Sequence, residues 1–149
     1  MGTRSLTFVH DEHGNAIVNM YRQFDGYISG HGAELSEFLS TMTMVNGYGE
    51  KVANLANGMG CLAAQMIAHF KVGVGGFYIH GVNETDCGQD YDYHVYANKV
   101  VVTSYDEPVF SGTWAEFHAF CHPTETPALT DDSIIDVEAR EVTDPLLLK

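Results

Sequence analysis

The spacing of apolar residues changes along the chain, and this change limits the folds that it can adopt. Residues 4–10 and 16–23 alternate between apolar and polar side chains, which predicts two strands that pair as a hairpin. Spacings of three and four residues come next over 35–42 and 51–70 and predict two helices. The chain therefore begins with a hairpin and then places two helices one after the other.

Alternation returns after the helices. The next strand is predicted over 74–80, and a hairpin over 91–105 turns at Ala97-Asn98. Pro108 restricts the next strand to a short edge segment at Val109-Phe110. A last helix is expected from the capping-box pattern of Thr113 and Glu116 to a stop at Pro123.

The predicted order, ββ-α-α-β-ββ-α, is typical of an α+β fold. We expect a mainly antiparallel sheet of about five to six strands, with helices packed on one face. At Thr124 the composition changes to acids, prolines and few aromatic residues. The sequence thus predicts a single domain over 1–123 and an extended acidic tail over 124–149.

Charge narrows the classes of partner. The 149 residues carry 20 acids and 7 bases, a net charge of −13, and only 7 of the acids lie in the tail. An acidic surface repels nucleic-acid backbones, so nucleic-acid binding is disfavoured. No apolar run is long enough to span a bilayer and no signal peptide is evident, so we expect a cytosolic protein without membrane contact. The three cysteines, an odd number, are read as reduced thiols.

A glycine-rich segment between the first hairpin and the first helix is the leading candidate for a ligand site. Strand 16–23 delivers a guanidinium to its end, and the loop then runs into a helix N-terminus, where free amides favour an anion. Aromatic side chains in the segment supply stacking faces. The predicted ligand-binding residues are Arg4, Tyr21, Arg22, Gln23, Asp25, Tyr27 and His31.

A structural interpretation of the same segment stays open. The glycines then permit turns, and the aromatic residues cover the core. Arg4 belongs to the candidate site because the first hairpin brings it near the chain opposite Arg22. Either the two arginines form a local positive patch, or each pairs with an acid such as Asp25 as a structural bridge.

Histidine and cysteine give weaker signals. His118, Cys121 and His122 have helical spacing that suits a soft metal, but no second pair of ligands stands out, so no metal site and no cofactor are predicted. A catalytic pair such as Cys87 with His80, or Asp25 with His31, requires a proximity in space that the sequence does not give. Acids beside Cys87 are expected to raise its thiol pKa and weaken it as a nucleophile.

The predicted hairpin over 91–105 has two distinct faces. Tyr91 and Tyr93 share one face with Val95, whereas Asp92, His94 and Tyr96 share the other. One face is expected to join the core. The other either packs as well or forms an exposed aromatic surface for a partner.

Two short runs resemble a group of small phage-encoded proteins. The chain opens with Met1-Gly2-Thr3-Arg4-Ser5 and carries Tyr21-Arg22-Gln23-Phe24-Asp25-Gly26-Tyr27, which is similar to the Tyr-x-Gln-Phe-Asp-Gly-Tyr run of that group. The resemblance covers about 1–122, with a weaker block at 108–113. It implies a viral accessory protein in the cytoplasm of a bacterial host. No activity is established for the group, so the resemblance assigns no catalytic residue.

The sequence favours a non-enzymatic accessory protein that sequesters a small anionic or nucleotide-like ligand, with a host defence as the expected target. No named phosphate-loop, hydrolase or metalloprotease pattern is present, which argues against an enzyme. Two alternatives stay open: an acidic interaction module that blocks a host protein, and a hydrolase of a small phosphorylated molecule. A homo-oligomer and a virion component are also left open.

Overall fold

The computed structural model describes residues 2–47 and 54–123, and it confirms the α+β fold. The main sheet has the strand order β5-β2-β1-β6-β7-β8. Neighbouring strands are antiparallel except β1 and β6, which are parallel. Its strands are β1 (Ser5–His10), β2 (Ala16–Arg22), β5 (Phe77–His80), β6 (Tyr91–Val95), β7 (Val100–Ser104) and β8 (Glu107–Gly112).

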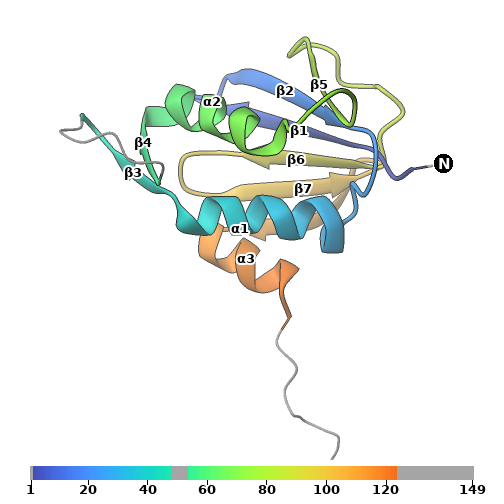
Figure 1. Cartoon of the computed structure of the whole chain (residues 1–149). Helices are drawn as coiled ribbons and strands as arrows, with labels where there is room; N and C mark the ends of the chain where they lie inside the picture. The colour runs from blue at the N-terminus through green and yellow to red at the C-terminus, as the bar shows by residue number, and fades with distance from the viewer. Residues whose placement is uncertain (1, 48–53, 124–149) are drawn as a thin grey trace, which may run out of the picture.

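Helices cover one face of this sheet (Figure 1). A π-helical turn, η1 (Ile28–Gly32), leads directly into α1 (Ala33–Thr41), and α2 (Gly58–Phe70) and α3 (Trp114–Cys121) complete the helical layer. Apolar side chains fill the space between the layer and the sheet. The fully buried members of this core include Val9, Met20, Leu35, Leu39, Met59, Leu62, Met66, Tyr93, Val95 and Phe117.

The helix predicted over 51–70 begins later than expected. Gly58 is its first residue, and a φ of 85° there keeps the preceding chain out of a right-handed helix. Leu55–Asn57 instead forms strand β4, which pairs in parallel with β3 (Thr43–Val45) as a separate two-stranded sheet. Leu55 fits the helical spacing of the apolar residues after it, and that coincidence produced the error. Residues 48–53 and the predicted tail over 124–149 lie outside the described residues.

The edge strand β8 is longer than the sequence suggested. Tyr105 and Asp106 both adopt positive φ, 51° and 65°, which is the geometry of a tight two-residue hairpin turn. Pro108 is accommodated because β8 is an edge strand, and the register shifts beside it. The pairing therefore extends from Glu107 to Gly112 rather than over two residues.

The connection over 81–90 crosses the face of the sheet that carries no helix. It leaves the edge strand β5 and returns to β6, so it passes β2 and β1 on the way. The Asn19 side-chain amide donates to the backbone oxygens of Gly81 and Glu84, both at 2.9 Å, and holds the start of the loop against β2. At its other end the Asp90 amide donates to the Arg4 carbonyl at 2.8 Å. Leu6 is fully buried on this face.

None of the helices in 2–47 and 54–123 combines the length and the apolar character that crossing a membrane requires. The described residues form a domain of two layers, the helices and the main sheet, and the 81–90 loop lies over the helix-free face of that sheet.

The predicted capping box at the start of α3 is confirmed. Thr113 Oγ1 accepts from the Glu116 amide at 3.1 Å, and Glu116 Oε1 accepts from the Thr113 amide at 2.8 Å. We predict that Thr113→Ala lowers the free energy of unfolding by about 1 kcal/mol, because the helix loses a cap. Thr113→Ser is the matched control and should retain nearly all of the stability in urea denaturation. Equal losses in both variants would contradict a role for the hydroxyl.

Candidate functional site

The sheet register separates the two arginines that the sequence placed together. Ser5 pairs with Arg22, so both side chains lie on the helix-covered face. Arg4 precedes Ser5, so its side chain lies on the helix-free face of the sheet. There the Arg4 guanidinium packs against Gly88, and a methyl group added to that glycine would lie 3.2 Å from Arg4 Nη1. The Arg4 amide also donates to Asp90 Oδ2 at 3.1 Å. The predicted positive patch is therefore divided between the two faces of the sheet.

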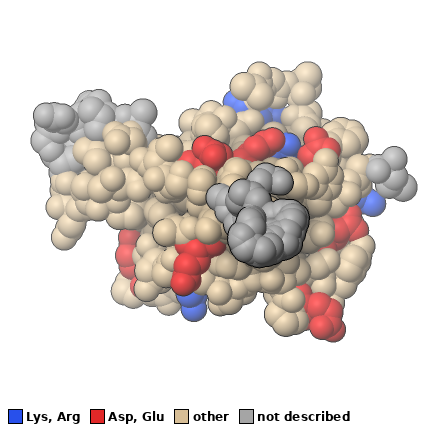
Figure 2. Space-filling view, turned by 90° about the horizontal axis from the view of Figure 1, so that it is seen from below, with Lys and Arg blue, Asp and Glu red and all other residues tan. Residues whose placement is uncertain are grey.

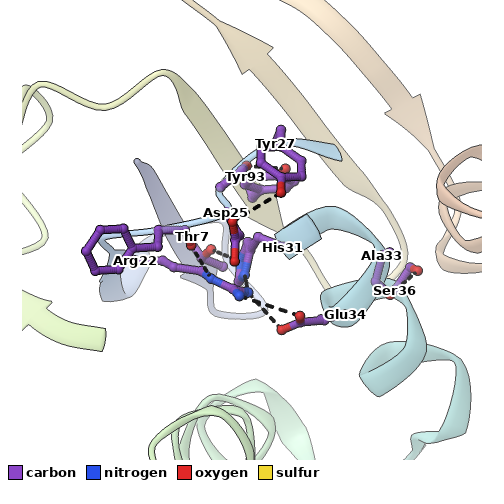
Figure 3. Close-up of polar contacts among 11 residues, drawn as sticks. Thr7, Arg22, Asp25, Tyr27, His31, Ala33, Glu34, Ser36 and Tyr93 are labelled. Carbon is purple, nitrogen blue, oxygen red and sulfur yellow. Dashed lines mark hydrogen bonds and ion pairs between the residues drawn. The ribbon is translucent and has the colours of Figure 1, made fainter. Parts of the chain in front are cut away.

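Most of the N–H donors of Arg22 are used within the protein. Its Nη1 and Nη2 donate to the two carboxylate oxygens of Glu34 at 2.8 and 3.5 Å (Figure 3). Its Nε donates to the Phe24 carbonyl at 2.6 Å. The guanidinium also lies over the Phe77 ring, 5.0 Å from the centroid. These contacts support the structural interpretation of Arg22. The depression of about 480 Å³ that Arg22 lines also contains Glu34 and Glu37, whose charges oppose an anion there.

His31 is completely buried beside Arg22. Arg22 Nη1 lies 3.2 Å from His31 Nδ1, and Thr7 Oγ1 lies 2.7 Å from His31 Nε2 (Figure 3). A guanidinium only donates, so Nδ1 must accept and the ring proton must reside on Nε2, which donates to Thr7. Burial, with the Arg22 charge second, lowers the His31 pKa to about 3. His31 is thus a neutral internal hydrogen-bonding group that a substrate does not reach.

The amides before α1 are occupied by the turn itself. His31 N donates to the Asp25 carbonyl at 2.7 Å, and the amides of Gly30 and Gly32 donate to the Tyr27 carbonyl at 3.0 and 3.3 Å. Asp25 adopts a φ of 62° to make this turn, and its carboxylate accepts from the Tyr27 hydroxyl at 3.1 Å. These backbone donors are not available to an anion.

The remaining predicted residues lie near the β5 edge. Tyr21 is on the helix-free face and stacks on His80, with ring centroids 5.0 Å apart. The backbone N–H of Gln23 donates to the Gly76 carbonyl at 2.9 Å and prolongs the pairing of β2 with the chain before β5. Of the seven predicted site residues, the structure brings Arg22 and His31 together, and it holds Asp25 and Tyr27 in the adjoining turn.

A cleft of about 700 Å³ lies on the helix-free face, away from those residues. Its floor is formed by β1 and β6, and its walls by the 81–90 loop and the turn at Tyr105-Asp106. Three aspartates line it, and none of its lining residues, all of which belong to the described part of the chain, is Lys or Arg. The residues that line the cleft include Phe8, Asp86, Gln89, Asp92, His94 and Asp106.

A hydrogen-bonded histidine pair fixes one acceptor in the cleft. His10 Nδ1 lies 3.0 Å from the Gly14 carbonyl, so this nitrogen carries the proton. When both rings are neutral, His10 Nε2 accepts from His94 Nδ1 at 2.9 Å, which leaves the lone pair of His94 on Nε2. Burial and the neighbouring His10 lower the His94 pKa to about 4, so the ring is neutral at pH 7. His94 therefore offers a hydrogen-bond acceptor to a ligand.

Asp92 concentrates negative charge at the cleft floor. Its carboxylate is half-buried and accepts from Gln89 Nε2 at 2.9 Å. Burial raises the Asp92 pKa, and the charges of Asp106 and Asp86 raise it further. The three carboxylates therefore repel one another, and a positive charge among them would relieve that repulsion.

Cys87 and His80 do come together beside the cleft. His80 Nδ1 lies 3.1 Å from Cys87 Sγ, the distance of a hydrogen bond to sulfur. Burial, followed by the charges of Glu84, Asp86 and Asp92, raises the Cys87 pKa. The Cys87 amide donates to Gln89 at 2.7 Å and the Gly88 amide points to Asp86, so neither is free to stabilise an oxyanion. The pair has the proximity of a catalytic dyad but not its activation.

Comparisons with protein-family models, with curated proteins and with solved structures give no match. The resemblance to phage proteins stays a prediction, and the function must be inferred from the geometry.

None of the seven predicted site residues lines the cleft, although one signal in the sequence pointed to part of it. The alternation along their hairpin puts Asp92, His94 and Tyr96 on one face, and Asp92 and His94 line the cleft. Asp86 and Asp106 join them only through the loop crossing and the tight turn, for which the sequence has no spacing signal. A second group was found only in part: the sequence pointed to His118 and His122, and the fold adds Glu37 to them, close enough to hold a metal ion.

We predict that His31 stays neutral, with its proton on Nε2, well below pH 6. The folded state disfavours the charged ring, so the unfolded state binds more protons between its ordinary pKa of about 6.5 and the folded value near 3. The stability that neutral His31 contributes to the folded state is present above the unfolded pKa of about 6.5, and it is lost as the pH falls from there toward the folded pKa of about 3. Between pH 7 and pH 5 it amounts to about 2 kcal/mol.

The ring nitrogens are followed by NMR, and stability by urea denaturation at both pH values. His31→Asn does not titrate and keeps an acceptor for Arg22, so its stability should fall less on acidification. A His31 pKa above 5, or a proton on Nδ1 at pH 7, contradicts the assignment.

We also predict that the Cys87 thiol reacts slowly with iodoacetamide at pH 7, because burial and nearby acids raise its pKa. Site-resolved mass spectrometry should give a slower rate than for N-acetylcysteine. Glu84→Gln should accelerate the reaction, whereas Glu107→Gln, an exposed acid that does not line the cleft, should not. A wild-type rate above that of the free thiol would revive the hydrolase alternative.

Proposed function

We propose that the chain is a non-enzymatic binding protein that holds a small organic cation in the cleft on its helix-free face. The observation that carries the proposal is the lining of the cleft, in which Asp86, Asp92 and Asp106 converge without a lysine or arginine among the lining residues of the described chain. A volume of about 700 Å³ lies within the range of small-molecule sites.

The charge of the cleft changes the ligand class from the anion expected from the sequence. An anion would meet three carboxylates, whereas Arg22 is turned to the opposite face and bound to Glu34. Arg4 lies closer, beside Gly88, but the acid on which its charge acts is Asp90, which does not line the cleft. A cation gains attraction from all three cleft aspartates. The electrostatic balance therefore favours a positively charged ligand.

Hydrogen bonding narrows the class further. The His94 Nε2 lone pair and the carboxylates are all acceptors, so the ligand should carry several N–H donors. The Phe8 ring, stacked on His94 at 4.9 Å, provides an apolar floor for a carbon chain. Polyamines and alkylguanidines combine donors, positive charge and an apolar chain, and we take them as the ligand class.

Two observations support binding rather than turnover. The described site has a Cys-His pair whose thiol pKa is raised and whose neighbouring amides are occupied. His31, the other candidate general base, is fully buried. The expected setting is that implied by the phage resemblance: an accessory protein in the host cytoplasm that sequesters its ligand to counter a host defence.

We predict that spermidine binds the protein with one-to-one stoichiometry in calorimetry, and that added salt weakens binding. Asp92→Asn should weaken it by about tenfold, since one charge-assisted contact is lost. Glu107→Gln is the control and should bind as the wild type does. AMP and cyclic nucleotides should give no heat.

Three outcomes would contradict the proposal. Equal effects of Asp92→Asn and Glu107→Gln would show attraction to the general acidity rather than to the cleft. Tighter binding of AMP, lost in Arg4→Ala, would restore the anionic ligand. If neither spermidine nor agmatine, an alkylguanidine, binds the protein, polyamines and alkylguanidines are ruled out as its ligands.

A further inference from the structure

Glu37, His118 and His122 bring three metal-ligating side chains together from two helices. Glu37 lies on α1, His118 on α3 and His122 directly after α3. Their ligand atoms all lie within 4.8 Å of one another. Glu37 is 81 residues from His118 in sequence, so the third ligand becomes visible only in the fold. Cys121, which the sequence grouped with the two histidines, is buried in the core and takes no part.

The backbone fixes which nitrogen of His122 faces Glu37. His122 Nδ1 lies 3.1 Å from the His118 carbonyl, which only accepts, so Nδ1 carries a proton. Ser36 Oγ lies 3.4 Å from the same nitrogen and donates its own proton to the Ala33 carbonyl. In metal sites, ligating histidines usually donate their other ring N–H to such an oxygen. The His122 ring is thus held with Nε2 toward Glu37.

This arrangement sets two acceptors, His122 Nε2 and Glu37 Oε2, against each other. In neutral His122 the Nε2 lone pair points to Glu37 Oε2, 3.4 Å away, and His118 Nε2 lies 3.2 Å from the same oxygen. The two imidazole rings are stacked with centroids 4.3 Å apart. A cation among the three atoms converts the repulsion into coordination. A proton shared with Glu37 would do so as well, and a zinc titration separates the two.

The spacing suits a transition metal. Ligands about 2.0–2.1 Å from a tetrahedral zinc ion lie about 3.3 Å from one another. Both carboxylate–imidazole distances, 3.2 and 3.4 Å, are close to this value. Two imidazoles with one carboxylate form a borderline-soft set that prefers zinc to magnesium or calcium. We propose that Glu37, His118 and His122 form a zinc-binding site between α1 and α3.

The site is open to solvent on one side. The Glu37 side chain is 61% exposed, and those of His118 and His122 are 36% and 34% exposed. Three protein ligands leave a fourth position for water or another molecule, as in zinc sites that are not purely structural. The ion would also cross-link α1 to the end of α3. The site lies among the helices, and none of its residues lines the acidic cleft, so the two proposals are independent.

The test uses the full chain and ZnCl₂ in calorimetry near pH 7. The wild type should bind one zinc ion at this site, and its thermal unfolding midpoint should rise with zinc. His118→Ala and His122→Ala should each weaken binding by at least about tenfold. His13→Ala is the matched control, since His13 is an exposed histidine in the β1–β2 turn, and it should bind as the wild type does.

Cys87 and His80 could bind zinc as well, because His80 Nδ1 lies 3.1 Å from Cys87 Sγ. The variant Cys87→Ser tests this second pair of ligands, and zinc binding should be retained in it. Binding lost in Cys87→Ser but kept in His122→Ala overturns the proposal. So does an absence of binding at micromolar zinc, which would leave a proton-bridged ion pair at Glu37. In NMR, zinc should shift the ring resonances of His118 and His122 and spare His13; perturbation of His13 alone would equally overturn it.

Discussion

The structure depends on the burial of β1 on both of its faces. Every residue of Ser5–His10 is buried, although only one face of the sheet carries helices. The second face of β1 is covered by the 81–90 loop, which must cross it because β5 and β6 lie on opposite sides of the β1–β2 pair. Two polar residues of β1 consequently form internal hydrogen bonds, Thr7 with His31 on one face and His10 with His94 on the other. The buried Ser5 hydroxyl has no hydrogen-bond partner among the described residues.

This constraint separates structural charge from charge available for recognition. Arg22 sits under the helical layer, where Glu34, Phe24 and His31 use its donors. Asp86 of the loop and Asp106 of the β7–β8 turn line the cleft on the other face, where none of the described lining residues is a lysine or arginine. Seen from below, acidic side chains outnumber basic ones and lie at several separate places on the surface (Figure 2). The acidity that the proposed function uses is the part that the loop crossing gathers over β6.

The fold class was accessible from the sequence because it depends on local signals. Alternation over 16–23, helical spacing over 35–42 and the capping box at Thr113 each report on a few neighbouring residues. The start of α2 was not accessible in the same way, because Leu55 fits a helical pattern while the φ of Gly58 prevents it. A periodic pattern does not register a backbone conformation at a single glycine.

The site was harder to predict because it is built from non-local proximity. Arg4 and Arg22 are brought close by a hairpin, yet the one-residue offset in register puts them on opposite faces, since Arg22 pairs with Ser5. The parallel contact of β1 with β6 then determines that His94 meets Phe8 and His10. A hairpin-linked sequence gives no reason to expect that contact, because parallel neighbours require a crossover elsewhere in the chain. The crossover here is the 81–90 loop, so the element that completes the sheet also builds one wall of its cleft.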